Sequence, residues 1–483
     1  MLFTSIEYYL FLPIVAMVYF LTPRRMRWGW LLLASYFFYM NWNPYYIVLI
    51  IGSTLIDYWA ALQMEKYEER SRRRPYMWFS VLANLGLLFT FKYFNFFSEQ
   101  ASQLMQWMVP GANYSIYLDV LLPVGISFYT FQTMAYTIDV YKGYTKAERH
   151  LGKYALYVSF FPQLVAGPIE RSRHLLKQFH FDYSFDYRRV RAGLQLIGWG
   201  MFKKLVIADR LALYVDEVFA SPAAYEGIVV WIAAFFFLFQ IYCDFSAYTD
   251  IAIGSARVLG VRLSKNFEHR VYVVTSFQKF WRGWHITLTS WFRDYVYFPL
   301  SRIQRGQRWL LVTTVMTFLL NGLWHGAEWT FLFWGGLNGL FIAVEILWQR
   351  PRDRLYAKWG IGKDSNWRPL LGFAVCFPLA LLSVIFFRAR DMVEATMLIG
   401  NSFAIKPIQL HQSLLVSNPI EFLSGFMLIA AMDGVHLWAG QRRIDEWLSD
   451  QPAGLRWGLY LLIFCTILYL GIPPQRQFIY FEF

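Results

Sequence analysis

Charged residues are scarce in this chain of 483 residues. They make up 16% of the sequence, whereas a soluble domain averages about a quarter. Hydrophobic residues make up 57% and aromatic residues 20%. This composition excludes a water-soluble globular protein and predicts a chain that exposes a large apolar surface to lipid.

Cysteine is also rare, and several enzyme motifs are missing. Cys243, Cys376 and Cys465 are widely separated, so they indicate neither a disulfide framework nor a metal site. The sequence contains no nucleophile motif centred on serine, no glycine loop that cradles phosphate and no Walker pattern. A zinc site needs three or four ligands. Only two histidines, His285 and His325, stand out here, and they lie 40 residues apart with no cysteine near them, which is too few ligands for zinc. We therefore expect no metal and no permanently bound cofactor.

The formal net charge of +13 is concentrated in short loops between apolar runs. Such loops are typical of the cytoplasmic side of a membrane protein, and this explains the charge better than nucleic-acid binding does. The first four loops alternate between basic and neutral or acidic, beginning with Arg24. This order predicts that the N-terminus lies outside the cytoplasm. A later basic loop, residues 350–368, followed by three expected spans, predicts the same for the C-terminus. The first apolar run lacks a basic leader and a cleavage site, so we expect a retained helix rather than a signal peptide.

Apolar runs close to the length of the bilayer core, about 20 residues, recur along the chain. We therefore predict an all-α polytopic membrane protein. It is expected to form one membrane domain, residues 1–483, with core motifs in 120–340 and peripheral helices in 1–98 and 369–472. The expected spans are residues 6–21, 28–40, 45–62, 78–96, 120–140, 309–320, 329–347, 370–387, 420–438 and 455–470, and further helices are expected at 190–219 and 228–259.

One apolar run is too short to cross a bilayer comfortably. Residues 154–166 lie between basic flanks that include Lys153 and Arg171, so both flanks are expected on the cytoplasmic side. We interpret residues 160–168, FFPQLVAGP, as a re-entrant segment. Non-helical backbone inside a membrane needs protein or water around it, which predicts a cavity on the cytoplasmic side.

Residues 276–297 carry aromatic side chains at three- and four-residue steps. This periodicity predicts an amphipathic helix at the cytoplasmic membrane boundary, with Lys279, Arg282 and Arg293 opposite the aromatic face. His285 is expected at the edge of that face. Two interpretations are open for it: a functional group, or an interfacial histidine that caps an aromatic belt.

His325 lies between two expected spans that only a few residues separate. It is therefore expected within the membrane or at its edge, where an ionisable residue is a functional hypothesis by default. Gly322 and Gly326 flank it, and small residues let a backbone or a ligand approach closely. The alternative is a packed histidine that is hydrogen-bonded to a neighbouring helix.

Four acidic residues are weaker candidates: Asp139, Asp244, Asp250 and Glu328. Asp244 and Asp250 do not share one face of a helix with 3.6 residues per turn, which argues against a paired acid and base. Structural ion pairs explain the aspartates as readily as chemistry does. Glu328 follows His325 closely, and either orients it or faces the lumen.

Six segments of the chain form one distinctive series: LPVGISFYTFQ (122–132), FFPQLVAGPIER (160–171), FKKLVIAD (202–209), YCDFSAYTDIAIG (242–254), FWRGWHITLTSWFRDYVY (280–297) and GLWHGAEWTFLFWG (322–335). Together they resemble the membrane-bound O-acyltransferase (MBOAT) family, especially its bacterial branch for alginate O-acetylation and teichoic acid D-alanyl transfer. The chain departs from the family pattern in two places. Gly283 replaces a frequent arginine, and residues 301–304 replace a glycine-rich turn.

The resemblance implies a ring of about 11 transmembrane helices, with re-entrant and amphipathic helices, around a central funnel and tunnel. It implies that His325 is the main catalytic residue and His285 the second. The implied supporting or donor-binding residues are Trp324, Trp284, Trp281, Arg282, Asp250, Asp244, Arg293 and Asp294.

The resemblance further implies acyl transfer to a hydroxyl, with acetyl-CoA or another cytoplasmic acyl thioester as donor. The expected acceptor is an extracytoplasmic polysaccharide, reached directly or through a periplasmic or extracellular partner protein. The expected location is the bacterial inner membrane. The alternative is a transporter or a scaffold subunit of an exopolysaccharide complex, but the inverted repeats typical of transporters are absent from the sequence.

Overall fold

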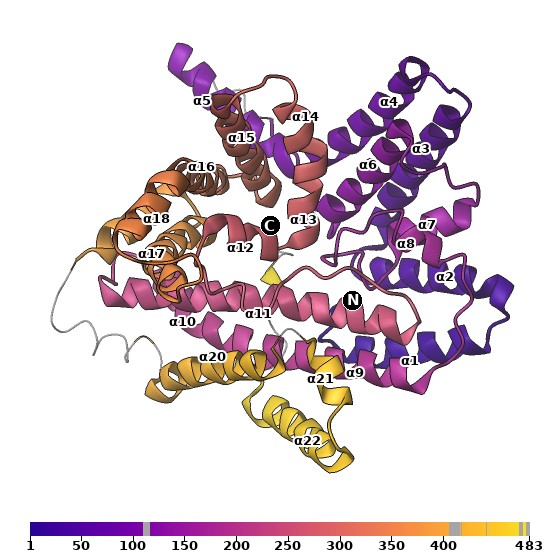
Figure 1. Cartoon of the computed structure of the whole chain (residues 1–483). Helices are drawn as coiled ribbons and strands as arrows, with labels where there is room; N and C mark the ends of the chain where they lie inside the picture. Colours follow the sequence, from indigo (N-terminus) through magenta and orange to yellow (C-terminus); the bar gives the residue numbers. More distant parts are fainter. Residues whose placement is uncertain (110–115, 405–415, 417, 441, 473–476, 480–483) are drawn as a thin grey trace. The chain divides into compact units, whose positions relative to one another are not determined.

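The computed structural model describes residues 1–109, 116–404, 416, 418–440, 442–472 and 477–479. Within these ranges the chain is helical and contains no strand (Figure 1), which confirms the predicted all-α class. The chain divides into two compact units. Unit 1 comprises residues 1–197 and 251–264, and unit 2 comprises residues 198–250 and the described part of 265–483. The prediction of a single membrane domain stays a prediction.

Seven helical stretches of the described chain are long and apolar enough to cross a membrane. They are Pro44–Glu65, Arg70–Met108, Ile228–Val258, Trp329–Lys358, Trp367–Arg388, Pro419–Ala439 and Ala453–Leu470. The helix α1 (Ile6–Leu21) is apolar but shorter. Each of these stretches overlaps a helix predicted from the apolar runs, which confirms a polytopic membrane protein.

Unit 1 contains the N-terminal helices. In chain order they are α1, α2 (Arg27–Met40), α3 (Ile47–Glu65), α4 (Arg70–Leu88), the π-helical segment η3 (Phe89–Tyr93), α5 (Phe94–Met108), α6 (Ile126–Lys142), α7 (Leu151–Ser159), α8 (Leu175–Gln178) and the start of α9 (Tyr187–Phe202). The helices α3, α4 and α6 pack side by side (Figure 1). Between them Asp57 is fully buried and accepts hydrogen bonds from Ser80 Oγ at 2.5 Å and Asn84 Nδ2 at 2.8 Å. These bonds satisfy a carboxyl group that would otherwise be costly to bury.

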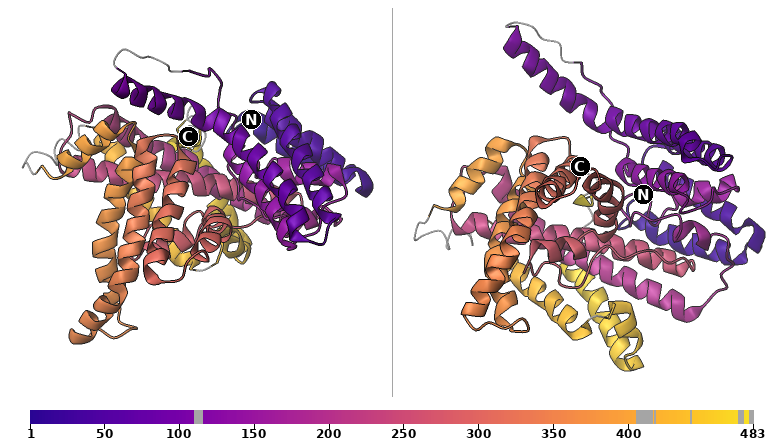
Figure 2. Two further views of the ribbon diagram at one scale, coloured as in Figure 1. Left: turned by 90° about the horizontal axis from the view of Figure 1, so that it is seen from above. Right: turned by 45° about the horizontal axis from the view of Figure 1, so that its top comes forward.

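The helix that begins at Arg70 continues beyond its predicted end. The segments α4, η3 and α5 form one continuous helical run to Met108, and α5 extends away from the other helices of unit 1 (Figure 2). The predicted end of this span at residue 96 is therefore wrong. Residues 94–108 contain neither proline nor glycine, so nothing in the local sequence stops the helix.

Residues 160–168 form buried turns after α7 ends, which confirms the predicted non-helical segment. The amide N–H of Phe161 donates to Ser35 Oγ at 3.1 Å. The side-chain amide of Gln163 donates to Gln132 Oε1 and to the Tyr157 carbonyl, both at 3.1 Å. Protein groups thus satisfy polar atoms that lipid could not. Its position as a re-entrant segment of the membrane stays a prediction.

Unit 2 contains the remaining helices. They are the end of α9, the π-helical segment η4 (Lys203–Ala208), α10 (Asp209–Ala220), α11 (Ile228–Val258) up to Asp250, α12 (Phe277–Gly283), α13 (Ile286–Phe292), the π-helical segment η5 (Arg293–Tyr297), α14 (Phe298–Ser301), α15 (Gln307–His325), α16 (Trp329–Lys358), α17 (Trp367–Arg388), α18 (Met392–Ser402), α20 (Pro419–Ala439), α21 (Ile444–Ser449) and α22 (Ala453–Leu470).

Two glycines bring α15 and α16 unusually close together (Figure 1). A Cβ atom on Gly322 would lie 2.2 Å from the carbonyl oxygen of Phe331, and one on Gly335 would lie 2.3 Å from that of Phe318. Small residues at such a crossing let two helices pack backbone to backbone. This contact fixes the end of α15, and with it His325, against α16.

A buried ion cluster in unit 2 holds the C-terminal tail. Lys204 Nζ lies 2.5 Å from Asp244 Oδ1 and 2.9 Å from Asp209 Oδ1, and it donates to the carbonyl of Gln477 at 3.1 Å. The amide N–H of Ile479 donates to Asp244 Oδ2 at 2.8 Å. Phe478 is buried, with its ring centroid 4.7 Å from Lys204 Nζ. The tail segment 477–479 is thus bound inside unit 2, although its side of the membrane stays a prediction.

Candidate active site

His325 is the last residue of α15 and is almost completely buried, with 3% of its surface exposed. Three aromatic rings enclose its imidazole, each approached edge-on. Their centroids lie 4.9 Å away for Trp324 and 5.2 Å away for both Trp334 and Phe387. This cage of rings fixes the orientation of the imidazole and keeps bulk water away from it.

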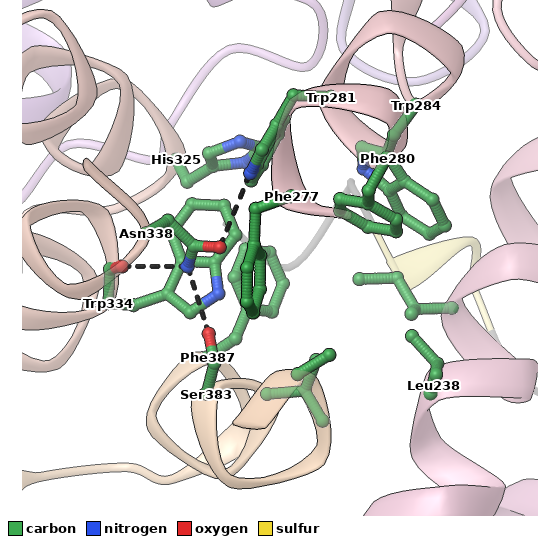
Figure 3. Close-up of a pocket in the computed structure, with 13 residues that line it drawn as sticks. Leu238, Phe277, Phe280, Trp281, Trp284, His325, Trp334, Asn338, Ser383 and Phe387 are labelled. Carbon is green, nitrogen blue, oxygen red and sulfur yellow. Dashed lines mark hydrogen bonds between the residues drawn. The ribbon is translucent and has the colours of Figure 1, made fainter. Parts of the chain in front are cut away.

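A small cavity of about 30 Å³ opens beside His325 (Figure 3). Its walls come from α11, α12, α16 and α17, and consist mainly of aromatic side chains, including Trp281, Trp284 and Trp334. A volume of this size holds about one water molecule. The cavity is therefore a narrow apolar slot that ends at an imidazole.

Asn338 of α16 is the polar centre of this slot (Figure 3). Its Oδ1 accepts a hydrogen bond from Trp281 Nε1 at 3.3 Å, and its Nδ2 donates to Ser383 Oγ and to the Trp334 carbonyl, both at 2.9 Å. Asn338 and Ser383 are both buried. One amide group therefore links three helices and sets the position of the Trp281 ring in the wall.

His285 lies at a break between two short helices. The helix α12 ends at Gly283, Trp284 is extended, and α13 begins at Ile286. The predicted continuous helix over 276–297 is therefore wrong. Asn266 explains the break, because its carbonyl accepts from the amide of Ile286 at 2.9 Å, and its Oδ1 accepts from Thr287 Oγ1 at 2.6 Å. Asn266, which lies in the segment before α12, therefore caps the start of α13.

The interpretation of His285 as an interfacial belt residue is also wrong, since its side chain is 1% exposed. Its backbone has φ of 42° and ψ of 56°, a left-handed conformation that favours glycine. Such strain in a residue other than glycine is often found at functional sites. Burial lowers the pKa of the His285 imidazole to about 3, so the ring is neutral near pH 7.

Trp324 lies between the two histidines. Its ring centroid is 6.0 Å from that of His285 and 4.9 Å from that of His325. Phe245 of α11 also packs against the His285 ring, and the two ring centroids lie 4.6 Å apart. The two imidazoles therefore belong to one buried aromatic cluster. Five of the residues that the sequence singled out lie in this cluster or line its slot: His285, His325, Trp281, Trp284 and Trp324.

The charged candidates do not line the slot and form ion pairs or lie exposed instead. Asp244 pairs with Lys204, and Asp250 pairs with Lys203 at 2.8 Å, so each aspartate has its own lysine. Arg293 pairs with Asp294 at 2.9 Å, and both are partly exposed. Arg282 is exposed on α12. Among the weaker candidates, Asp139 lies 3.5 Å from Arg173 in unit 1, and the exposed Glu328 is the residue immediately before α16.

Sequence reasoning missed Asn338, Ser383 and Asn266. Asn338 is an amide in an otherwise apolar helix, and that was an available signal because a buried polar group needs partners. Ser383 and Asn266 gave no comparable signal. The close packing at Gly283 was also hidden: a Cβ there would lie 3.1 Å from Glu268 Cβ and Val271 Cγ2. A larger side chain at this position, where arginine is frequent in the family that the sequence resembles, would require Glu268 or Val271 to shift.

Comparison with known proteins identifies a family whose sequence model covers the residues of the site. The sequence model of the membrane-bound O-acyltransferase family matches residues 144–387, a range that contains both histidines, Asn338 and Ser383. In the part of the chain that the structure describes, no group of three or more His, Cys, Asp or Glu side chains is placed to hold a metal ion.

Curated relatives match over the whole length of the chain. The probable alginate O-acetylase AlgI of Azotobacter vinelandii is 38% identical across all of both chains. The protein of the same name from Pseudomonas putida is 33% identical, again across all of both chains. The peptidoglycan O-acetyltransferase of Helicobacter pylori is 28% identical over 99% of this chain and 97% of its own length.

Proposed function

This chain belongs to the membrane-bound O-acyltransferase family, and from that premise we propose that it transfers an acetyl group to hydroxyls of an extracytoplasmic polysaccharide. Membership in the family makes it an O-acyltransferase of the membrane. The observation that carries the proposal is the buried imidazole of His325 at the end of an apolar slot. The names of the relatives, which act on alginate and peptidoglycan, support a polysaccharide as the final acceptor.

In the proposed reaction, His325 acts as a general base. Its imidazole removes the proton from the acceptor hydroxyl, and the hydroxyl oxygen attacks the carbonyl carbon of an acyl thioester. The new C–O ester bond forms as the C–S bond breaks, and the proton passes from His325 to the departing thiolate. The aromatic cage supports this role, because an oriented base in a site without bulk water needs little reorganisation.

The donor is proposed to be acetyl-CoA or another acyl thioester from the cytoplasm. A slot as narrow as this supports the smallest acyl group, since each further methylene would meet the walls formed by Trp281 and Trp334. Exclusion of one methylene from an apolar pocket discriminates by about 10- to 200-fold. The acyl group would therefore be selected by the size of the slot rather than by a polar contact.

Replacement of Trp281 by alanine is expected to relax this selection. The ring is buried, and its Nε1–H is held by Asn338, so its removal enlarges the slot directly. We expect the rate ratio of butyryl to acetyl transfer to rise by at least about tenfold, because the variant no longer excludes the extra methylenes. The measurement is transfer from acetyl-CoA and butyryl-CoA by the purified protein in vesicles.

Trp199→Ala is the matched control, because it also removes a buried tryptophan of unit 2 but not one that lines the slot. Its ratio of butyryl to acetyl transfer should remain that of the unmodified protein. An unchanged ratio in Trp281→Ala would show that the slot does not hold the acyl group.

The location and the partners are proposals as well. The apolar spans support a multi-pass protein of the bacterial inner membrane. The alternating charge of the first loops supports an N-terminus outside the cytoplasm, and the basic loop at residues 350–368 supports the same side for the C-terminus. A periplasmic or extracellular protein is a proposed partner, which presents the polysaccharide hydroxyl to the membrane protein or carries the acetyl group on to further hydroxyls.

The experiment that tests the function uses vesicles that contain the purified protein and receive acetyl-CoA labelled in the acetyl group on the cytoplasmic side. An acyltransferase is expected to release free CoA and to transfer label to an added glycan acceptor as a base-labile ester. The measurement is label in the glycan before and after mild alkaline treatment.

Two results would contradict the proposal. A transporter would accumulate intact labelled donor on the far side without an ester product, and a scaffold would leave the donor unchanged. Analysis of surface glycans for ester-linked acyl groups, with and without the gene, extends the same test to cells.

A further inference from the structure

Unit 1 contains a second cavity, and none of its lining residues is assigned to catalysis. It has a volume of about 330 Å³ and is lined by the segment between α1 and α2, the start of α7 and the segment that follows α8. Four basic side chains line it: Arg24, Arg25, Arg27 and Lys153. We call this cavity the basic pocket. Asp182 is the single carboxylate among its lining residues.

The four cations of the basic pocket are not neutralised within the described chain. Arg27 donates to three backbone carbonyls, those of Phe20, Thr22 and Tyr183, and none of these bonds brings a negative charge. Lys153 Nζ contacts Nδ1 of His180 at 3.1 Å. Salt bridges to Arg24, Arg25, Arg27 and Lys153 do not occur in the described residues. Four positive charges and one carboxylate around the cavity leave an excess of positive charge, which attracts an anion.

The walls of the basic pocket combine these cations with large apolar and aromatic side chains. Trp28 forms one wall, with its ring centroid 4.6 Å from that of His150. Phe181, which also lines the pocket, is exposed, as is Leu21 at the end of α1. Aromatic rings and basic side chains occur together at the boundary between a membrane and water. A site for a soluble anion has no need of an exposed apolar rim.

We propose that the basic pocket binds the phosphate headgroup of an anionic phospholipid, with the acyl chains of the lipid along the exposed apolar side chains of its rim. Basic pockets between membrane helices are suited to such headgroups, because each lysine or arginine near the surface adds to the attraction. Arginine also forms two parallel hydrogen bonds to phosphate. The lipid would connect the end of α1, the start of α2 and the segment around Phe181.

The test compares three forms of the full-length protein. The pocket variant is Arg24→Gln/Arg25→Gln/Lys153→Gln, which leaves the structural bonds of Arg27 intact. The control is Arg72→Gln/Arg74→Gln. These substitutions remove positive charge from two exposed arginines of α4 that do not line the pocket. Each protein is incorporated into nanodiscs of phosphatidylcholine with or without phosphatidylglycerol. Lipid that remains bound after transfer to detergent is counted by native mass spectrometry.

The unmodified protein and the control are expected to retain phosphatidylglycerol in preference to phosphatidylcholine, and the pocket variant to retain about tenfold less. Lys153→Gln alone should give a smaller loss in the same direction, which keeps the test valid if the triple variant folds poorly. Equal retention by all forms would overturn the proposal. Binding of inorganic phosphate or of CoA that the pocket variant loses, together with equal retention of phosphatidylglycerol by all forms, would show that the pocket is a site for a soluble anion instead.

Discussion

Replacement of His325 by alanine is expected to lower acyl transfer by about 10²- to 10⁴-fold, which is the usual contribution of a general base. The imidazole is the ionisable group that lies on the slot beside Asn338, and three aromatic rings hold it in one orientation. The measurement is the initial rate at which labelled acetyl enters an alkali-labile ester in vesicles, normalised to the amount of protein in the membrane.

A control is needed because alanine also leaves an empty space among Trp324, Trp334 and Phe387. The variant His325→Phe keeps a ring in the cage but removes the base. It should be as inactive as His325→Ala while its unfolding temperature stays closer to that of the unmodified protein. Residual activity near the unmodified rate in either variant, with normal membrane insertion, would contradict the assignment of His325.

His285→Ala provides a comparison within the same experiment. His285 contacts Trp324, and not the slot, so a smaller loss of rate is expected for it than for His325. The variant with the larger loss of rate identifies the imidazole that acts as the base. A larger loss for His285 would indicate that this imidazole is the base and that His325 supports it.

The sequence predicted the helices of this protein well, because in a membrane protein the apolar runs are themselves the physical constraint. A helix satisfies its own backbone hydrogen bonds, so a run of sufficient length needs no partner to define it. The stretches Trp367–Arg388 and Pro419–Ala439 follow the predicted runs closely. The helical extension to Met108 was missed, because amphipathic residues can continue a helix beyond its apolar part.

The break at His285 could not be predicted from local periodicity. Aromatic residues recur through it at helical spacing, yet contacts from a separate segment interrupt the helix. Asn266 binds the start of α13, and the amide of Glu268 donates to the carbonyl of Gly283 at 2.9 Å. Tertiary contacts of this kind override a local preference for helix. The histidine was therefore identified as a candidate, but its burial and its left-handed backbone were not.

The polar network of the slot was hidden for the same reason. Asn338 and Ser383 lie 45 residues apart in sequence, and their hydrogen bond depends on how α16 packs against α17. Lys203 and Lys204 were visible as charges within a predicted helix, but the acidic partners that balance them lie mostly on another helix, α11. A single sequence shows that such a charge needs a partner, and the fold decides which one.

Lys204→Met is expected to destabilise unit 2 strongly and to release the C-terminal tail. The substitution leaves Asp209 and Asp244 buried without their shared cation, and removal of one partner from a buried ion pair costs about 3–5 kcal/mol. It also removes the hydrogen bond to the carbonyl of Gln477 and the contact with the Phe478 ring. The measurements are the temperature at which monodisperse protein is lost in detergent, and the rate at which a protease removes the tail.

A control variant distinguishes the effect of breaking the buried ion cluster from the effect of removing any lysine side chain. Lys177→Met removes an exposed lysine of α8 and should change neither measurement. The triple variant Lys204→Met/Asp209→Asn/Asp244→Asn removes all three charges, so it should recover much of the lost thermal stability, because no uncompensated charge stays buried. Its tail should still be cleaved faster than in the unmodified protein, since the carbonyl of Gln477 has lost its donor. If Lys204→Met is as stable as Lys177→Met, the buried ion cluster does not hold unit 2 together, and the tail must be held by the packing of Phe478 and the hydrogen bond from the Ile479 amide to Asp244.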